Sequence, residues 1–492
     1  MNTQFINTRL INAVKQFPQS EKWVLVIGDL MLDRYLIGDV QRISPEAPVP
    51  VVLLKQQNDR AGGAANVAAN LAGLGVETHI AGCVGQDTEA SILVGLINRM
   101  GISTDAVIHS ETRPTTAKTR IMSSHQQIVR VDQESAESFN EAESTELRVR
   151  IDETLKNKPA IVILSDYAKG VLNESLCKAI IKECNFAGIP VLADPKGLDY
   201  SKYQGATALT PNKKETAEAC GVSMSDTNAL LAGAQALKKK LGLQFLAVTR
   251  GEEGISLLEG SGEHHISATA KQVFDVSGAG DTVIATLAAG LIHGLIPQEA
   301  LALANAAAGV VVGKVGTVPI NRDELLNELA SKEANEQADK ITDLATLSSK
   351  VAAWKAAKQK IVFTNGCFDL LHAGHVTYLE AAKKTGDKLI LGLNTDRSVS
   401  ALKGPSRPVI HEKDRARVLA ALEAVDAVIL FDEDTPLNLI HALKPDVIVK
   451  GDDYSEDQVV GGKEVKSWGG EVKLIPLVQG RSTSKIIAKM AQ

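Results

Sequence analysis

The chain has 492 residues, with 53 lysines and arginines against 59 aspartates and glutamates, so its net charge at pH 7 is −6. This acidic balance, without any block of basic residues, argues against a general binder of nucleic acid or of anionic membranes. Aromatic residues make up only 4%, which argues against stacking platforms for single-stranded nucleic acid. The length exceeds one ordinary core and predicts about two to four domains.

Patterns that would direct the chain to or across a membrane are missing. The N-terminal residues show no basic flank followed by an apolar core, and the most apolar stretches, Ile284–Ile296 and Ala300–Val315, are too short to span a bilayer. The five cysteines are scattered without CxxC spacing, which is typical of buried thiols in a reducing compartment. We therefore expect a cytoplasmic protein.

Short apolar runs alternate with helical patterns, which predicts an α/β fold with a parallel sheet. Two stretches differ, because Thr, Val, Ile and Arg alternate in Asp33–Lys55 and Thr115–Asp132 without helical periodicity. They predict a small β-rich insertion beside the main sheet. The strands expected in that sheet are Trp23–Ile27, Ala160–Leu164, Pro190–Ala193, Ala206–Leu209 and Phe245–Thr249.

A polar, charged segment, Asn327–Ile341, separates this series from a second α/β series. It predicts an exposed helix or linker and hence a domain boundary. We expect a first domain at residues 1–330, a linker at 331–348 and a second domain at 349–492. The strands expected in the second domain are Lys360–Thr364, Lys388–Leu393, Ala427–Phe431, Val447–Lys450 and Val472–Pro476.

The most specific motif of the first domain is Asp275–Thr282, DVSGAGDT, which is followed by the helical pattern Val283–Gly290. Small residues let the backbone approach a ligand, and a helix start presents free N–H groups to phosphate. Asp281 at that point is suited to accept a proton from an attacking hydroxyl. The alternative is a glycine-rich turn in which Asp281 only caps the helix.

Three further segments accompany this motif. Gly62-Gly63-Ala64-Ala65-Asn66 leads into a helical pattern, while Thr210–Glu215 and Thr249–Gly251 each follow an expected strand. Open α/β sheets bind ligands at the carboxyl ends of their strands, where these segments fall. No GxxxxGK[ST] sequence occurs, so a nucleotide would be bound without a P-loop.

Together these motifs resemble the ribokinase/fructokinase-type carbohydrate kinases. The resemblance implies a ribokinase-like three-layer domain with a β lid, with Asp281 as the catalytic base and Gly278, Ala279 and Gly280 as the anion hole. It implies sugar binding at Asp33, at the end of the first strand, and at Gly62, Gly63 and Asn66. Residues implied around ATP and Mg²⁺ are Asn212, Lys213, Lys214, Glu215, Thr249, Gly251 and Asn305.

A phosphorylated sugar also needs cations near its phosphate. Arg120 and Lys169 are our candidates, and Arg42 and Arg130 lie in the same β-rich insertion. For each of them, an ordinary solvated surface position is the competing interpretation.

In the second domain, the expected strand Lys360–Thr364 runs into Asn365-Gly366-Cys367-Phe368-Asp369 and then His372-Ala373-Gly374-His375, before a helical pattern. Histidines three positions apart at a helix start share a face, so their N–H groups and the helix amides can stabilise a pentacoordinate α-phosphate. Zinc binding is a weaker alternative, because neither HExxH spacing nor a cysteine-rich partner set is present. Simple capping of the helix by the histidines is the other alternative.

This block resembles the cytidylyltransferase-like nucleotidyltransferases, which implies a smaller, Rossmann-like domain. His372 and His375 become catalytic, with no metal as a fixed protein site. The HxGH sequence also occurs in class I aminoacyl-tRNA synthetases, but an anticodon-binding module is missing. The nucleotide-binding residues implied, including the segment after Arg481, are Asn365, Gly366, Phe368, Asp369, Gly374, Lys403, Arg407, Lys450, Gly451, Asp452, Ser482, Thr483 and Ser484.

The order of both motif sets resembles a family of bacterial enzymes that combine a heptose-7-phosphate kinase with a heptose-1-phosphate adenylyltransferase. The resemblance implies phosphorylation of D-glycero-β-D-manno-heptose 7-phosphate at C1 and adenylyl transfer from ATP to heptose 1-phosphate, giving ADP-heptose for the lipopolysaccharide core. It implies ATP and Mg²⁺ as cofactors, phosphosugar substrates, neither nucleic acid nor membrane as partner, and a homodimer through the lid. The alternatives are another phosphosugar, CTP in place of ATP, or a non-catalytic sugar-phosphate sensor.

Overall fold

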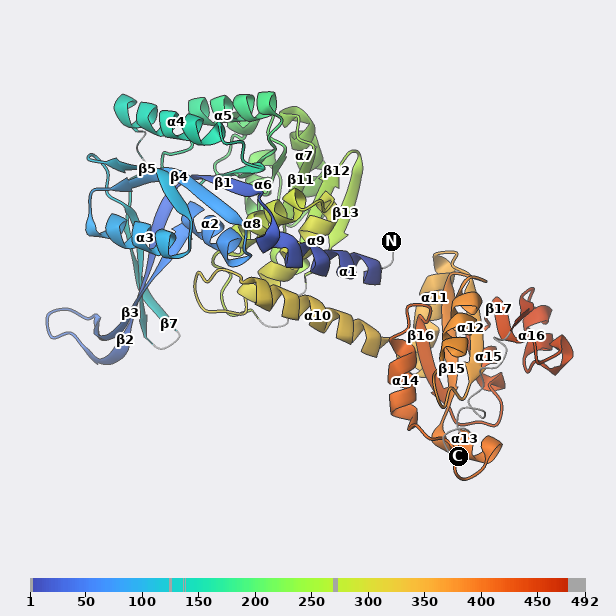
Figure 1. Cartoon of the computed structure of the whole chain (residues 1–492). Helices are drawn as coiled ribbons and strands as arrows, with labels where there is room; N and C mark the ends of the chain where they lie inside the picture. Colours follow the sequence, from blue (N-terminus) through green and yellow to red (C-terminus); the bar gives the residue numbers. More distant parts are fainter. Residues whose placement is uncertain (1–2, 124–125, 136, 138, 269–272, 477–492) are drawn as a thin grey trace. The chain divides into compact units, whose positions relative to one another are not determined.

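The computed structural model describes residues 3–123, 126–135, 137, 139–268 and 273–476. Its backbone divides into two units, Met1–Ala330 and Ser331–Gln492, and each is described by itself (Figure 1). Among the described residues, no helix combines the length and the apolar character that crossing a bilayer needs.

The first unit is built on a nine-stranded sheet with the order β13-β12-β11-β10-β9-β8-β1-β4-β5. Neighbouring strands from β5 to β11 are parallel, and β12 and β13 are added antiparallel at one edge. The strand order reverses direction at β1, where a doubly wound sheet places its ligand. The strands are β1 (Trp23–Gly28), β4 (Glu77–Gly85), β5 (Ser103–Ser110), β8 (Ile161–Ser165), β9 (Val191–Asp194), β10 (Ala208–Leu209), β11 (Phe245–Thr249), β12 (Ile255–Glu259) and β13 (Gly262–Ile266).

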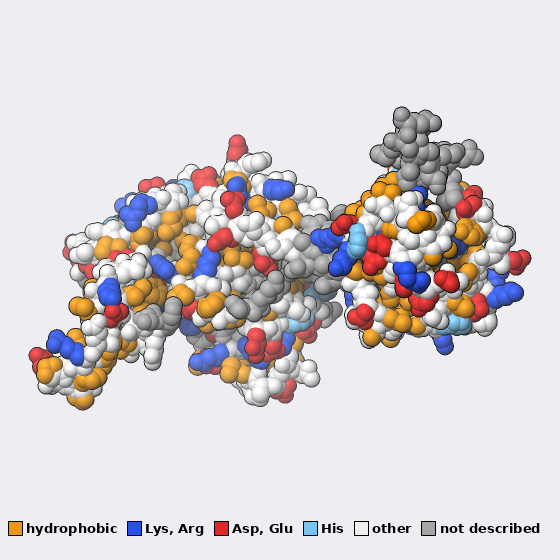
Figure 2. Space-filling model, turned by 90° about the horizontal axis from the view of Figure 1, so that it is seen from below, with side chains coloured by type: hydrophobic (Ala, Val, Ile, Leu, Met, Phe, Trp, Pro, Cys, Tyr) orange, Lys and Arg blue, Asp and Glu red, His pale blue; other side chains and the backbone are white. Residues whose placement is uncertain are grey.

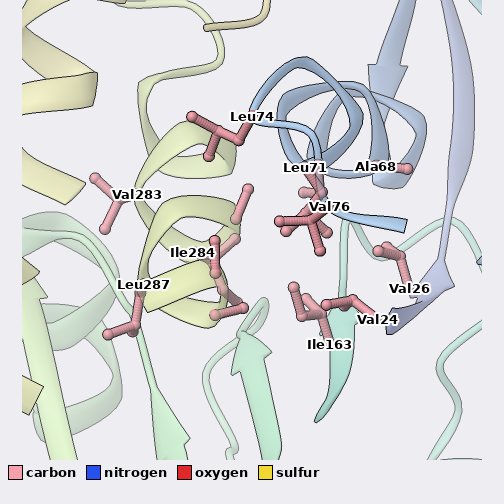
Figure 3. Packing of buried hydrophobic residues seen from close by; sticks show 14 of the residues in the cluster. Val24, Val26, Ala68, Leu71, Leu74, Val76, Ile163, Val283, Ile284 and Leu287 are labelled. Carbon is pink, nitrogen blue, oxygen red and sulfur yellow. The ribbon is translucent and has the colours of Figure 1, made fainter. Parts of the chain in front are cut away.

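Helices cover both faces of this sheet because its strands are apolar on both sides. On one face, β1 and β8 pack against α2 (Ala64–Gly73) and α8 (Ala279–Ile292), as Figure 3 shows for Val24, Ile163 and Ile284. The same face carries α1 (Thr3–Gln16), α3 (Thr88–Arg99), α9 (Pro297–Val311) and the start of α10 (Arg322–Asp339). The other face carries α4 (Glu141–Leu155), α5 (Glu174–Ala187) and α7 (Thr227–Leu241), and α6 (Lys213–Cys220) precedes α7 (Figure 1).

A second, four-stranded sheet forms the β-rich insertion predicted from the sequence, with the order β3-β2-β6-β7. We call it the lid. Its end at β2 and β3 projects from the unit and mixes hydrophobic with charged side chains (Figure 2). Its strands are β2 (Leu30–Ile43), β3 (Pro50–Gly63), β6 (Thr116–Ser123) and β7 (Gln126–Gln133). Asp33, expected at the end of the first strand, lies in β2 instead, because β1 already ends at Gly28.

The second unit is a five-stranded parallel sheet with the order β16-β15-β14-β17-β18, which reverses direction at β14. One face packs against α12 (Ala373–Lys383) and α14 (Glu412–Ala420), the other against α11 (Leu344–Ala356), α15 (Leu437–Leu443) and α16 (Gly462–Ser467). A further helix, α13 (Asp396–Lys403), follows β15. The strands are β14 (Ile361–Gly366), β15 (Lys388–Asn394), β16 (Ala427–Phe431), β17 (Val447–Gly451) and β18 (Glu471–Ile475).

The stretch of chain from β13, the last strand of the first unit, to β14, the first strand of the second, is mostly helical. α10 continues to Asp339, and the chain from Lys340 onward pairs with the second sheet. The Val428 amide donates to the Lys340 carbonyl at 2.7 Å, and the Thr342 amide donates to the Val428 carbonyl at 3.0 Å. Leu347 of α11 is fully buried in the second unit.

These contacts predict where the second unit can be separated. A chain of residues 340–492 keeps both the pairing with Val428 and the buried Leu347, so it should fold alone. A chain of residues 349–492 loses both, and its free energy of unfolding should be lower by about 3 kcal/mol, the usual cost of losing one buried leucine. Urea denaturation of the two pieces measures the difference, and equal stabilities would contradict the prediction.

Candidate active sites

In the first unit, polar side chains collect at the carboxyl ends of the parallel strands. Asp29 follows β1, Tyr167 follows β8, Asp194 ends β9 and Thr249 ends β11. The strand register places these ends at the same edge of the sheet. The start of α8 lies at this edge as well, because Asp281 contacts Tyr167.

Asp281 is the centre of this cluster. It is only 3% exposed, and both of its carboxylate oxygens accept a hydrogen bond. The Tyr167 hydroxyl donates to Oδ1 at 2.6 Å, and the Asn66 amide donates to Oδ2 at 2.7 Å. Burial raises the pKa of the Asp281 carboxyl from 3.8 to about 6, while these two donors oppose the rise. A carboxylate with this pKa is suited to proton transfer near neutral pH.

The capping alternative for Asp281 is wrong, because Gly278 is the N-cap of α8 and Asp281 lies inside the first turn. Gly278 has φ +78°, and a Cβ there would lie 2.7 Å from the Asn66 amide nitrogen. Only glycine suits this position. The Ala279 amide donates to the Val276 carbonyl at 3.2 Å, whereas the Gly280 and Asp281 amides have no backbone acceptor among the described residues.

Asp33 lies buried where the lid meets the sheet. Its oxygens accept from Arg120 at 2.6 Å and from the Thr317 hydroxyl at 3.0 Å. Gly62 of β3 lies against it, and a Cβ on Gly62 would come within 2.6 Å of Asp33 Oδ2. The neighbouring Gly63 has φ +56°. The structure therefore brings Asp33, Gly62 and Arg120 together as predicted, but Asn66 points to Asp281 rather than to this group.

Cations gather on the lid and in the loop after β8 that faces it. Lys169 pairs with Glu134 at 2.7 Å and Arg130 with Asp132 at 2.8 Å. Lys118, which the sequence analysis did not select, is half-buried beside the Tyr167 ring. Burial, together with the charges of Lys169 and Arg130, lowers its pKa against the opposing effect of Asp33 and Glu134. A phosphate near Lys118 would relieve this repulsion.

The residues expected around ATP follow β10 and β11. Asn212 caps α6 by accepting from the Glu215 amide at 2.9 Å, and Asn212 and Thr249 form a parallel bridge. Asn305 of α9 donates to the Ser267 carbonyl at 2.7 Å. The remaining members lie close in sequence: Lys213 pairs with Glu253, Lys214 with Glu218, and Gly251 has φ +61°.

A second carboxylate of this edge, Asp194, was also missed from the sequence. Burial and the nearby Asp281 raise its pKa well above the ordinary range. Asp194 accepts a hydrogen bond from the Thr210 hydroxyl at 3.3 Å, and Glu215 lies near enough to affect its charge. Such buried carboxylate oxygens are the ligands that Mg²⁺ prefers. Among the described residues, however, no group of three or more side chains forms a preformed metal cluster.

In the second unit the HxGH segment follows β14, the strand at which the sheet order reverses. His372 is the N-cap residue of α12 without a side-chain cap bond, so the capping alternative is wrong. The His372 and His375 rings stack at 3.9 Å between centroids, and Phe368 contacts His375 edge-on at 5.1 Å. Burial, His372 and Lys403 lower the pKa of His375 from 6.5 to about 4. His375 is therefore neutral at pH 7.

Two further charged residues of this unit lie near the ends of its strands, Lys450 in β17 and Asp369 shortly after β14. Lys450 of β17 donates to the Asn365 carbonyl at 3.0 Å, and burial lowers its pKa to about 8. Asp369 is buried and binds the loop after α13, accepting from Arg407 and from the Val409 amide. Asp369 thus anchors the loop rather than facing an open site.

Arg415 was missed because one arginine in a charged helical pattern has no distinguishing signal. Its guanidinium is almost completely buried and donates to the carbonyls of Cys367 at 2.6 Å and Asn394 at 2.9 Å. It also pairs with Asp396 at 2.6 Å. Arg415 thereby joins the segments that follow β14 and β15.

The other predicted positions are distributed as follows. Gly366 ends β14, Gly374 lies in the first turn of α12, and Gly451 ends β17, with Asp452 directly after it. Ser482, Thr483 and Ser484 lie outside the described residues.

Comparisons with known proteins agree with these two sites. Residues 22–324 match the model of the pfkB family carbohydrate kinases, and residues 363–490 match the cytidylyltransferase-like model. The bifunctional protein HldE of Methylobacillus flagellatus is 66% identical over 475 residues, 96% of this chain and 97% of that protein. The bifunctional protein HldE of Magnetococcus marinus is 54% identical over the same shares. The chain belongs to the HldE family.

Membership of the HldE family confirms the predicted pair of enzymes, a sugar kinase followed by a nucleotidyltransferase, and the kinase family uses ATP. The fold of the kinase half is also that of phosphofructokinase-2 from Escherichia coli, with a TM-score of 0.54 and 18% identity. That alignment covers 63% of this chain and 99% of the other. The ribokinase-like and Rossmann-like fold classes expected from the sequence are confirmed.

Tyr167, like Lys118 and Asp194, is a member of this kinase site that sequence reasoning did not select. The signal available for Tyr167 was its place directly after a buried strand, in the segment Ser165–Gly170. Nothing in the sequence shows that its hydroxyl reaches α8, which is more than a hundred residues away.

Proposed function

We propose that residues 1–330 transfer the γ-phosphoryl group of ATP to the C1 hydroxyl of D-glycero-β-D-manno-heptose 7-phosphate. Residues 349–492 then transfer AMP from ATP to heptose 1-phosphate, after a separate phosphatase has removed the 7-phosphate. The product is ADP-heptose for the lipopolysaccharide core. The observation that carries this proposal is the buried Asp281 beside first-turn amides of α8 that have no backbone acceptor among the described residues, in a chain of the HldE family.

In the kinase step, Asp281 accepts the proton of the C1 hydroxyl as the sugar oxygen forms its bond to the γ-phosphorus. The bond from that phosphorus to the β,γ-bridging oxygen breaks, and ADP leaves with the electron pair. The Gly280 and Asp281 amides, which have no backbone acceptor among the described residues, stabilise charge on the transferred group. The Ala279 amide is engaged with Val276, so Ala279 contributes shape rather than a donor.

The lid supplies contacts to the sugar and its phosphate. Asp33, which also accepts a hydrogen bond from Arg120, accepts hydrogen bonds from sugar hydroxyls. Lys118, Lys169 and Arg120 bind the 7-phosphate. Bound with the ATP phosphates, Mg²⁺ would reduce their negative charge. Asp194 and Glu215 are suited to hold it, because their carboxylates lie near each other at the strand ends.

In the adenylyl step, a phosphate oxygen of heptose 1-phosphate attacks the α-phosphorus of ATP. The bond from that phosphorus to the α,β-bridging oxygen breaks, and pyrophosphate leaves, so no proton transfer is required. Neutral His375 donates a hydrogen bond to the pentacoordinate phosphate, and Lys450 and Lys403 neutralise its charge. Gly374 leaves room for the phosphates against the first turn of α12.

Product analysis tests the substrates. With heptose 7-phosphate and ATP the chain should form a bisphosphate, and a phosphatase specific for the 7-phosphate should convert the mixture to ADP-heptose. Mass spectrometry identifies both products. A second arm with CTP separates the two nucleotides, since a CDP-sugar would contradict the adenylyl assignment. An unchanged sugar with bound ATP would indicate a sensor.

The substitution Asp281→Asn replaces the basic carboxylate by an amide group of nearly the same size and shape. Kinase turnover should fall by about a hundredfold to ten-thousandfold, the usual contribution of a general base. Adenylyl transfer by the same chain should persist, so it serves as an internal control for folding. Asp226→Asn, which alters the exposed cap of α7, is the matched control and should leave both rates unchanged. Substantial phosphorylation by Asp281→Asn would contradict the assignment.

The protonation state of His375 can be measured directly. In a chain labelled at histidine, the NMR signal that disappears in His375→Gln should titrate near pH 4, because burial and neighbouring cations disfavour the charged ring. A midpoint near 6.5, the ordinary value for histidine, would contradict the lowered pKa of His375.

The lid also supports the proposed homodimer. Strand register places Val129 and Val131 on the face of the lid opposite Lys118 and Arg120, and these valines are 46% and 54% exposed. Exposed apolar side chains on one sheet face are typical of an interface. Sedimentation should give twice the chain mass, and Val129→Lys should reduce it to one chain. Leu198→Lys, at a 70% exposed leucine elsewhere in the unit, should leave the dimer intact.

A further inference from the structure

The Asp281 carboxylate is held by two neutral donors rather than by a cation. Tyr167 donates to Oδ1 and Asn66 to Oδ2, at 2.6 and 2.7 Å. Each donor comes from a different element, the loop after β8 and helix α2. The carboxylate is therefore fixed in position and orientation before substrate binds.

The Asn66 amide cannot rotate freely, because a network fixes which of its atoms faces Asp281. Asn70 donates to the Asn66 carbonyl at 2.8 Å and to Asn66 Oδ1 at 3.3 Å. Asn70 Oδ1 in turn accepts from the Ile320 amide and the Thr282 hydroxyl, each at 3.0 Å. Rotating either amide would place two acceptors or two donors together.

The loop that carries Tyr167 is held by the Asp29 carboxylate. Three backbone amides donate to it, those of Tyr167 at 2.8 Å, Lys169 at 3.0 Å and Val171 at 3.2 Å. Asp29 directly follows β1, so the phenol is tied to the centre of the sheet. Ala168 and Gly170 adopt positive φ in this loop, which shows that the backbone is bent to meet Asp29.

We propose that Tyr167 is a positioning residue of the kinase, whose hydroxyl holds the Asp281 carboxylate ionised and oriented to accept the proton of the sugar hydroxyl. The inference rests on the proposed role of Asp281 as the base. Tyr167 itself transfers no proton: the sugar hydroxyl proton goes to Asp281, and the phenol remains the donor throughout. Burial and the nearby carboxylates raise the pKa of Tyr167 well above its ordinary range, so the phenol stays protonated.

The charged groups that face Asp281 act in opposite directions. Asp33 from the lid raises its pKa, and Lys118 from the same sheet lowers it. Asp194 from β9 is a further neighbour, whose own pKa is raised by Asp281. Against burial, the Tyr167 and Asn66 hydrogen bonds are the largest effects that keep the carboxylate ionised. Losing one of them should raise the pKa of Asp281.

Tyr167→Phe removes the donor and keeps the ring. Because a hydrogen bond to a charged group corresponds to about one to two pKa units, the acid limb of the kinase kcat/KM profile should move upward by about one pH unit or more. On the alkaline plateau the rate should return to within about tenfold of the parent rate, since Asp281 is then ionised again.

The matched control is Tyr200→Phe. Tyr200 is a buried tyrosine of the same unit, and its hydroxyl has no hydrogen-bond partner among the described residues. Its removal should leave the acid limb in place. Replacing Tyr167 by 3-fluorotyrosine supplies an opposite test that keeps the native shape, because the more acidic phenol is a stronger donor and should move the limb downward.

An acid limb that stays in place in both Tyr167 variants, with a rate lowered equally at every pH, would overturn the proposal and indicate a packing role. If Tyr167→Phe fails to fold, shown by loss of ATP binding to the kinase unit, the fluorotyrosine shift decides alone. The base assignment is tested separately, since Asp281→Asn should lower turnover by about a hundredfold or more at every pH. A kinase that survives Asp281→Asn would contradict the proposed function, whereas an unmoved limb contradicts only the role of Tyr167.

Discussion

Two sheets that are mostly or wholly parallel, each covered by helices on both faces, impose the constraint on which both sites depend. Strands buried on two sides have no room for unpaired polar groups, so chemistry-bearing side chains lie at the strand ends. In the first unit the ends of β1, β8 and β9 supply Asp29, Tyr167 and Asp194. In the second unit the end of β14 supplies the HxGH segment. The direction reversal at β1 and at β14 opens the crevice in each case.

Within the kinase site, burial and hydrogen bonding oppose each other on one carboxylate. Burial alone would keep Asp281 protonated and useless as a base, whereas full solvation would leave it too weak. Two neutral donors place its pKa at about 6. A cation in the place of Tyr167 would have lowered the pKa much further. The fold therefore sets the protonation state of the base through the packing of α2 and the loop after β8 against α8.

In the nucleotidyltransferase site, burial of the catalytic groups has a different consequence. Burial there keeps His375 uncharged, so the ring is a hydrogen-bond donor of fixed protonation state near neutral pH. Cationic charge comes instead from lysines, of which Lys450 is held against the Asn365 carbonyl. Arg415 joins the segments after β14 and β15, and Asp369 anchors the loop after α13. These buried charges fix the loops around the histidines relative to one another.

The sequence by itself determined the α/β class, most strands and the motif residues, because apolar periodicity and glycine-rich helix starts are local signals. The ribokinase-like and Rossmann-like classes came from the resemblance of those motifs to known families. Asp281, His372 and His375 were found in this way. Tertiary structure alone decided that Tyr167 and Asn66 meet Asp281, that Arg120 pairs with Asp33 and that Lys340 pairs with the second sheet. It also decided which groups are charged, since pKa depends on burial and on neighbours that are distant along the chain.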